Sequence, residues 1–197
     1  MANEKDRDPQ EVRKVIAKHT PVYALMGHLA SDWAMLELMV NQLIWKLADV
    51  SPVTGACVTA QIFTINNRLM AVISLMRLRG FDETMVKEVN KFSDAIRGPA
   101  EGRNRTIHDP VVVSVKDEAI GRLEVTAQRK PVFEVVPISV EEINKVRLEI
   151  LKCTNDLIDL RQKILEKLRT LPEIPKSSPL PIDLTVMVDR VGPTIGK

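Results

Sequence analysis

The feature that most constrains this chain is a stripe of apolar residues at three- and four-residue steps between Pro21 and Ala48. Such steps place side chains on one face of an α-helix, whereas a half-buried strand alternates every two residues. The stripe consists of Val22, Leu25, Met26, Leu29, Trp33, Leu36, Val40, Leu43, Ile44 and Leu47. A helix this long needs packing partners along its whole length, so we expect a mainly helical bundle.

A second apolar set on the same helix lies outside the stripe. It consists of Met35, Leu38, Met39 and Trp45. One core-facing stripe is enough for a surface helix, so further apolar positions indicate a second contact. We therefore expect this helix to contact its own core on one side and a partner chain on the other.

Proline marks the starts of several predicted helices. Asp8-Pro9, Thr20-Pro21 and Ser51-Pro52 each place an N-cap residue before a proline at the first helical position. The expected helices are 9–18, 21–48, 52–79 with a break near 64–67, and 82–97 after the cap Asp82. Gly80 is expected to end the third of these helical stretches.

Gly98-Pro99 is expected to break the fourth helix, and Pro99 to open a short helix carrying Glu101 to His108. Asp109-Pro110 ends this helix, because a residue before proline disfavours the α conformation.

The pattern then changes to short β-branched runs, which predict two or three antiparallel strands at about 111–137. Ser139-Val140-Glu141-Glu142 is a capping box that opens a last long helix to about residue 169. The expected organisation is a short N-terminal helix (1–20), a helical domain with the β insertion (21–170) and a proline-rich tail (171–197). The tail is either disordered or an extended arm, and 182–188 could add as an edge strand to a second chain.

Charge and composition limit the function classes. Of the 197 residues 45% are hydrophobic, and 28 basic against 26 acidic residues give a net charge of +2. This balance argues against a general polyanion binder, although a local basic site stays open. The charged N-terminus has no signal core, and no apolar run approaches membrane-spanning length, so we expect a cytoplasmic protein without a membrane partner.

Cys57 and Cys153 have no Cys or His neighbours at metal-ligand spacing. We expect two buried thiols in a reducing compartment, with a disulfide or a catalytic thiol as alternatives. Neither a metal nor a cofactor is expected.

Of the three histidines, His19 and His28 are interpreted as structural: His19 at a helix end and His28 as a packed or surface residue. His108 differs because Arg103, Asn104 and Arg105 precede it. Histidine exchanges protons near neutral pH, arginine offers planar donors to phosphate, and asparagine can orient an imidazole. Such a set could bind and cleave a phosphodiester without a metal.

Helix geometry qualifies this hypothesis. At ~100° per residue, Asn104 and His108 lie ~40° apart on one face, Arg105 ~60° from His108, and Arg103 ~140° from it. Arg103 reaches a His108 only by curling its side chain or by meeting that of another chain. The alternative is structural: Arg103 and Arg105 as ion-pair partners, and His108 as a helix C-cap beside Asp109.

The run Arg103-Asn104-Arg105-Thr106-Ile107-His108 resembles the signature of HEPN domains, in which an Arg, often followed by Asn, precedes a His by several residues. Trp33-Ala34-Met35-Leu36-Glu37 resembles the early helix of that family with its acidic residue. The resemblance covers about residues 20 to 170. It implies a helical bundle that dimerises, with Arg and His of two protomers converging across the dimer axis.

Active members of this family are metal-independent endoribonucleases. The resemblance implies that His108 acts as general acid or base and that Arg103 stabilises the charged phosphorane. Asn104 would act as the orienting residue of the site. Arg105 and Glu37 are supporting candidates, Glu37 for positioning Arg103. The implied partners are a second copy, RNA and, in a toxin or phage-defence setting, an antitoxin-like protein.

Two other functions compete with this reading. The first is a non-catalytic interaction or scaffold protein of the same fold, in which Arg103 and His108 hold the dimer or the bundle. The second is a nucleotide-binding module, but Gly98-Pro99-Ala100-Glu101-Gly102 lacks the lysine and the spacing of a phosphate-binding loop.

Overall fold

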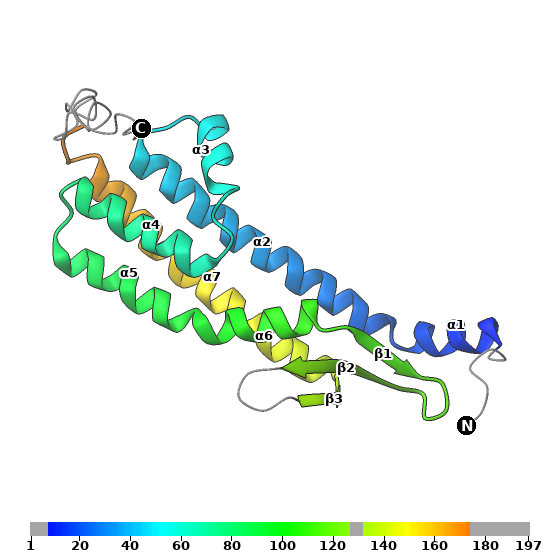
Figure 1. Cartoon of the computed structure of the whole chain (residues 1–197). Helices are drawn as coiled ribbons and strands as arrows, with labels where there is room; N and C mark the ends of the chain where they lie inside the picture. The colour runs from blue at the N-terminus through cyan, green and yellow to red at the C-terminus, as the bar shows by residue number, and fades with distance from the viewer. Residues whose placement is uncertain (1–7, 127–131, 174–197) are drawn as a thin grey trace, which may run out of the picture.

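The computed structural model describes residues 8–126 and 132–173 (Figure 1). This part of the chain contains seven helices and a three-stranded antiparallel sheet before the last helix, which confirms the predicted fold class. The helices are α1 (Pro9–Lys18), α2 (Thr20–Ala48), α3 (Pro52–Thr59), α4 (Ile65–Leu78), α5 (Glu83–Ala95), α6 (Arg97–His108) and α7 (Val140–Leu168). The strands are β1 (Val111–Ser114), β2 (Ala119–Thr126) and β3 (Val132–Pro137).

Two long helices form the axis of the molecule. α2 and α7 each have 29 residues, so each extends roughly 43 Å at the helical rise of 1.5 Å per residue. They lie side by side, with α4 and α5 against one end and α6 with the sheet at the other (Figure 1). The chain is therefore elongated, and the predicted motif lies away from the α4–α5 end.

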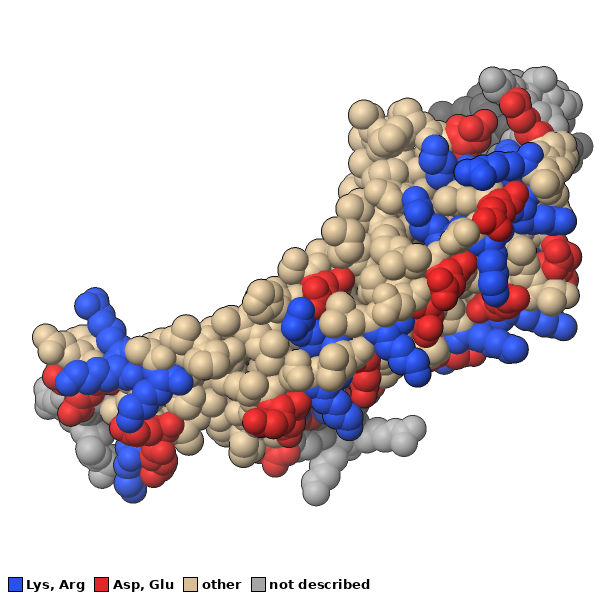
Figure 2. Space-filling view, turned by 180° about the vertical axis from the view of Figure 1, so that it is seen from behind, with Lys and Arg blue, Asp and Glu red and all other residues tan. Residues whose placement is uncertain are grey.

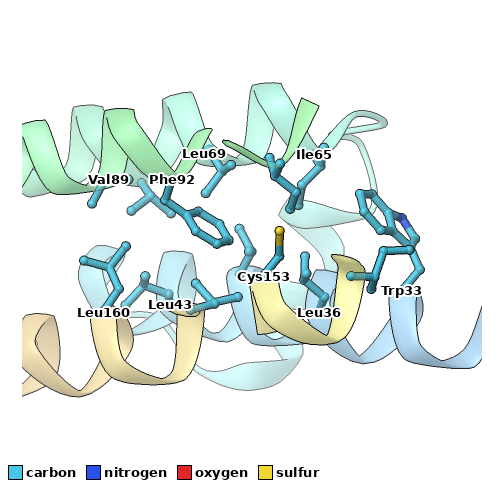
Figure 3. Packing of buried hydrophobic residues seen from close by; sticks show 14 of the residues in the cluster. Trp33, Leu36, Leu43, Ile65, Leu69, Val89, Phe92, Cys153 and Leu160 are labelled. Carbon is cyan, nitrogen blue, oxygen red and sulfur yellow. The ribbon is translucent and has the colours of Figure 1, made fainter. Parts of the chain in front are cut away.

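The apolar stripe of α2 faces the core, as predicted. All of its members are buried except Leu25 and Met26, which pack partly buried against the core. Figure 3 shows Leu36 of α2 among Leu69 of α4, Phe92 of α5 and Cys153 of α7. Met35 and Leu38, outside the stripe, are exposed.

Two of the three predicted N-caps are confirmed. The Asp8 carboxylate accepts from the Gln10 N–H, and the Ser51 hydroxyl accepts from the Thr54 N–H. The third prediction is wrong, because His19 occupies the cap of α2 and Thr20 is its first helical residue. Thr20 instead donates its hydroxyl hydrogen to the Ala17 carbonyl over 2.8 Å, which satisfies the end of α1.

The predicted break between residues 52 and 79 separates α3 from α4, and the Thr64 hydroxyl caps α4 by accepting from the Asn67 N–H. Gly80 follows the end of α4 with a φ of 78°, a conformation in which glycine has no steric penalty. Both features agree with the sequence pattern.

The predicted break between the two helices is present, but it lies at Ile96 and not at Gly98-Pro99. Only Ile96 separates α5 from α6, and Gly98 and Pro99 lie in the first turn of α6. The first N–H groups of a helix have no intrahelical partner, so Pro99 costs α6 no hydrogen bond there. Ile96 is 1% exposed, and its burial fixes the junction of the two helices.

The sheet has the order β1-β2-β3 and follows the predicted meander. The turn between β1 and β2 contacts the end of α1, where Glu118 pairs with Lys18 and its carbonyl lies 3.0 Å from His19 Nε2. The predicted tail beyond residue 173, with the edge strand 182–188, lies outside the described residues.

The cysteine prediction is only half right. Cys153 is buried, but Cys57 on α3 is exposed, because α3 covers α2 with the side opposite to it. In the described ranges, the helices are all too short or too polar to cross a bilayer.

Candidate functional site

The predicted motif occupies the second half of α6. This helix packs on α7 and, more lightly, on α2. Gly102 permits the close approach to α7, because a Cβ at this position would lie 3.2 Å from both methyl carbons of Val146. The absence of a side chain at 102 thus sets the depth at which Arg103 and His108 sit on the bundle.

Arg103 and His108 meet within one chain. Arg103 Nη1 lies 2.9 Å from His108 Nε2, although the two Cα–Cβ bonds point ~140° apart around the helix. The Arg103 side chain curls along α6 to make this contact. A guanidinium has only donors, so in a hydrogen bond across this distance Nε2 of His108 is the acceptor.

Asn104 completes the set. Its Oδ1 accepts from the same Nη1 of Arg103 over 3.0 Å. Asn104 and His108 share the exposed face of α6, as predicted from their four-residue spacing. In this conformation Asn104 orients the guanidinium and makes no hydrogen bond to the imidazole.

Trp33 of α2 lies beneath Arg103. The guanidinium carbon is 5.7 Å from the centre of the Trp33 ring, within the range of a cation–π contact. Trp33 is 4% exposed, and Arg103 Nε is buried with no hydrogen-bond partner among the described residues. The inner side of the Arg103 guanidinium therefore packs on the apolar ring of Trp33.

Carboxylates distinguish the two arginines of the motif. Among the described residues Arg103 makes no ion pair. Arg105 binds Glu101 over 3.0 Å and Glu124 of β2 over 3.3 Å, and Glu124 also contacts Arg122. Arg105 therefore ties α6 to the sheet, whereas Arg103 keeps an uncompensated charge beside the imidazole.

Glu37 does not approach this set. Its Oε1 lies 2.8 Å from Arg68 Nη1 of α4, at ion-pair distance but without hydrogen-bond alignment. The structure therefore gives Glu37 a role between α2 and α4, whereas Arg103 contacts Asn104, His108 and Trp33.

The other two histidines lie elsewhere. His28 is exposed on α2, and His19 contacts the turn between β1 and β2. Neither belongs to the set around Arg103.

A cavity of about 300 Å³ lies on the other side of α6, between this helix, the sheet and α7. Its lining includes Arg105, Arg122 and Glu142 but neither Arg103 nor His108. The candidate site is thus an open surface set, suited to an extended ligand more than to an enclosed small molecule. No three metal-ligating side chains cluster within residues 8–126 and 132–173.

The sequence reasoning missed one contributor, the role of Trp33 as a platform. Its place in the apolar stripe predicted burial in the core and nothing more. No spacing in the sequence links residue 33 to residue 103, since the contact arises only when α6 packs on α2.

Comparison with known proteins finds no match: no family model, no curated protein and no solved structure matches this chain.

Proposed function

We propose that this protein is a HEPN-like, metal-independent endoribonuclease whose site consists of Arg103, Asn104 and His108. One observation carries the proposal. An arginine without a carboxylate partner among the described residues lies 2.9 Å from the only imidazole on α6, at the molecular surface. A cation that binds phosphate beside a group that transfers protons is the minimum that phosphodiester cleavage requires.

The neutral imidazole supplies the base. The lone pair of His108 Nε2 accepts a hydrogen bond from Arg103 Nη1 in the free protein. A phosphate is a stronger acceptor for a guanidinium than an imidazole is, because the bond is charge-assisted. Phosphate binding would therefore draw Arg103 to the ligand and free Nε2.

In the proposed reaction, the nucleophile is the 2′-hydroxyl of the RNA itself. Nε2 takes the proton of a 2′-hydroxyl while the 2′-oxygen bonds to the adjacent phosphorus, and Arg103 stabilises the charge on the phosphorane oxygens. The bond from phosphorus to the 5′-oxygen breaks, and the leaving oxygen takes a proton from the imidazolium or from water. The products are a 2′,3′-cyclic phosphate and a 5′-hydroxyl end.

Incubation of the purified protein with single-stranded and structured RNA in EDTA tests this proposal. We expect cleavage by the wild type, cyclic phosphate ends, and a loss of roughly 10²- to 10⁴-fold in His108→Ala, the usual contribution of general acid–base catalysis. The control is Lys87→Ala, an exposed cation on α5 outside both the set and the outer face of α2, which should cleave as the wild type does. Equal cleavage by His108→Ala would sink the proposed site.

The proposal includes a homodimer formed through the outer face of α2. From Ala24 to Trp45 this face carries the small or uncharged residues Ala24, Gly27, Ser31, Ala34, Met35, Leu38 and Gln42. Met35 and Leu38 are 55% and 40% exposed, and α3, which packs on α2, and the segment after it expose Val53 and Phe63 at 77% and 82%. Figure 2 shows this border, along α2 up to α3, free of charged side chains. An uncharged apolar face suits a contact between two identical chains. Near a two-fold axis, a charged residue would lie beside the same residue of the second chain and be repelled by it.

Light scattering after gel filtration tests the dimer. We expect twice the chain mass for the wild type and the mass of one chain for Leu38→Lys, with Ile158→Lys, an equally apolar exposed position on α7, as the control. A wild type that elutes as one chain at all concentrations would remove the dimer from the proposal.

We further propose a toxin or phage-defence role, in which an antitoxin-like protein covers the exposed Asn104–His108 face. Expression in a bacterial host should then arrest growth in the wild type and not in His108→Ala. Normal growth with both the wild type and His108→Ala would contradict the toxin or defence role, but it would not affect the result of the nuclease assay.

The second candidate is a non-catalytic interaction protein. It is favoured by the contact of the Arg103 guanidinium with the ring of Trp33, which joins α6 to α2 and can serve a structural role. This candidate predicts that Arg103→Ala lowers the melting temperature or dissociates the dimer, and that the wild type turns over no RNA.

A further inference from the structure

We infer that the C-terminal segment 182–188 lies as an extended arm across the outer sheet face. This face is formed by the side of the strands that carries Val112, Gly121, Leu123, Val125, Phe133, Val135 and Pro137. The inference does not depend on the proposed function. It assigns an occupant to an exposed apolar surface and a role to a part of the chain that lies outside the described residues.

The opposite, inner face of the sheet carries all the charged residues of the three strands. Ile120 on this face is 8% exposed and belongs to the core. Arg122 and Glu124 follow it at two-residue steps on the same face and pair with residues of α6 and its C-cap. Glu134 of β3 lies opposite Glu124 and therefore shares that face. The charges of the sheet are thus on the side of the helices.

The outer sheet face is uncharged, mostly apolar and exposed. Leu123 lies opposite Val135, and Val125 lies opposite Phe133. Val125, Val135 and Phe133 are 60%, 59% and 77% exposed. A cavity of about 330 Å³, lined by residues of all three strands, adjoins Val135. An antiparallel sheet with one face in water ordinarily has polar residues on that face. The reverse distribution indicates that another apolar segment covers it.

The C-terminal segment has the pattern that this face requires. Its apolar residues at two-residue steps are Ile182, Leu184, Val186 and Val188. Successive side chains of an extended backbone point to opposite sides, so these four would share one side. Pro179 and Pro181 favour an extended backbone directly before them. An arm on the surface keeps its backbone groups in contact with water and needs no strand partner.

The other ranges outside the described residues do not offer such a segment. Residues 1–7 and 127–131 have the sequences MANEKDR and AQRKP, and neither contains an apolar run. A segment of the same chain also has an advantage over a separate protein, because a tether gives it a high effective concentration at the sheet. We therefore commit to the segment 182–188 as the occupant.

The chain beyond α7 is long enough to reach the sheet. α7 runs from the sheet to the opposite end of the molecule, where the described chain stops at Glu173 (Figure 1). Glu149 of α7 lines the same cavity as Val136 of β3, so the sheet lies beside α7 as far as Glu149. The helix from Glu149 to Leu168 is roughly 28 Å long, and an extended chain from Glu173 to Ile182 spans up to about 32 Å.

A fluorescent reporter in the full chain tests whether the segment covers the face. Phe133→Trp places an indole at the most exposed of these positions. We expect blue-shifted emission that acrylamide quenches weakly. Leu184→Asp combined with Val186→Asp should shift the emission to the red and increase quenching several-fold, because two charges then oppose the apolar contact.

The matched control adds the same two charges to the other side of the segment. Thr185→Asp combined with Met187→Asp should leave the emission and the quenching of the reporter unchanged. Equal quenching in all three chains would overturn the inference. Equally strong quenching would mean an uncovered face, and equally weak quenching a face covered by something else.

A disulfide trap gives a second, independent measurement. Val125→Cys and Val186→Cys are combined with Cys57→Ser, which removes the exposed native thiol. The control replaces the first of these with Leu148→Cys on α7, which is 57% exposed against 60% for Val125. Under mild oxidation we expect the sheet position to form the disulfide several times faster, because the bond requires close and lasting proximity.

Equal rates of disulfide formation at the two positions would overturn the inference, even where all variants fold. The mass of the unreduced product identifies the copy that supplies the segment. A product of one chain and a product of two chains both support the inference, because each places 182–188 on the outer sheet face.

Discussion

Arg103 Nη1 and His108 Nε2 lie 2.9 Å apart in a single chain, although their positions face away from each other on α6. The contact is made by a long side chain turned along its helix and supported from below by a ring of another helix. Arg103 and Arg105 consequently have different roles, and substitutions at the two positions should have different effects.

The first prediction compares Arg103 with Arg105. Arg103→Lys should lower the single-turnover rate of RNA cleavage by about 10²-fold, because an ammonium neither stacks on Trp33 nor offers planar paired donors. Arg105→Lys should stay within a few-fold, since Arg105 is engaged with Glu101 and Glu124. Thermal melts should place both variants within about 1 kcal/mol of the wild type, the usual range for exposed ion pairs. Equal losses of rate would contradict the assignment of separate tasks.

The second prediction concerns the start of α7. The Ser139 hydroxyl accepts from the Glu142 N–H and the Glu142 carboxylate accepts from the Ser139 N–H, each over 3.1 Å. Ser139→Ala should reduce the free energy of unfolding by about 1 kcal/mol, because it removes one half of this capping box. Urea unfolding followed by circular dichroism measures the change. Lys87→Ala, at an exposed position within α5, should change it by less than about 0.5 kcal/mol.

The third prediction concerns the contact of α3 with α2. A Cβ at Gly55 would lie 2.3 Å from Trp45 Cδ1, so Gly55→Ala must displace the indole or the helix. We expect a loss of about 1 to 3 kcal/mol, the usual cost of overpacking. Gly98→Ala on α6, where no atom lies within 4 Å of the added carbon, should instead stabilise the protein by roughly 0.5 to 1 kcal/mol. Opposite signs in the two melting curves are the expected outcome, and equal signs would contradict the packing of α3.

The fourth prediction concerns the thiols. Cys57 is exposed, whereas burial raises the pKa of the Cys153 thiol above its ordinary value. Because the thiolate is the reactive form, a thiol reagent under native conditions should modify one cysteine rapidly and the second only after unfolding. Cys57→Ser should abolish the rapid phase and Cys153→Ser should leave it unchanged. A rapid phase that survives Cys57→Ser would contradict the burial of Cys153.

The same thiol gives stability a pH dependence of definite sign. With the folded pKa of Cys153 above the unfolded value, the folded state retains a proton that the unfolded state releases. Stability from this group is therefore complete below the unfolded thiol pKa and declines as the pH rises above it. Comparison of urea midpoints for the wild type and Cys153→Ser at neutral and alkaline pH isolates this contribution.

Most of the fold could be predicted from the sequence, because local patterns specify it. The stripe of α2, the capping box of α7 and the cap Asp82 of α5 each combine periodicity with a side-chain acceptor for an orphan N–H. The errors lie where two helices nearly touch. Thr20 and Pro99 both looked like boundaries, but the buried Ile96 and the junction residue His19 decide where the chain turns.

Less of the candidate site could be predicted. The shared face of Asn104 and His108 follows from helical spacing alone. The partner of Glu37 and the platform under Arg103 depend on how α2 packs against α4 and α6, and such contacts between distant segments leave no trace in local periodicity.

The ion pairs beside the motif have a structural consequence. Arg122 of β2 binds Asp109, the residue after His108, over 2.7 Å, and Arg105 binds Glu124 of the same strand. The far end of this hairpin rests on α1 through Glu118. The hairpin thus connects the first helix of the chain to the residue that follows His108 through side-chain contacts, in addition to the burial of Ile120 in the core.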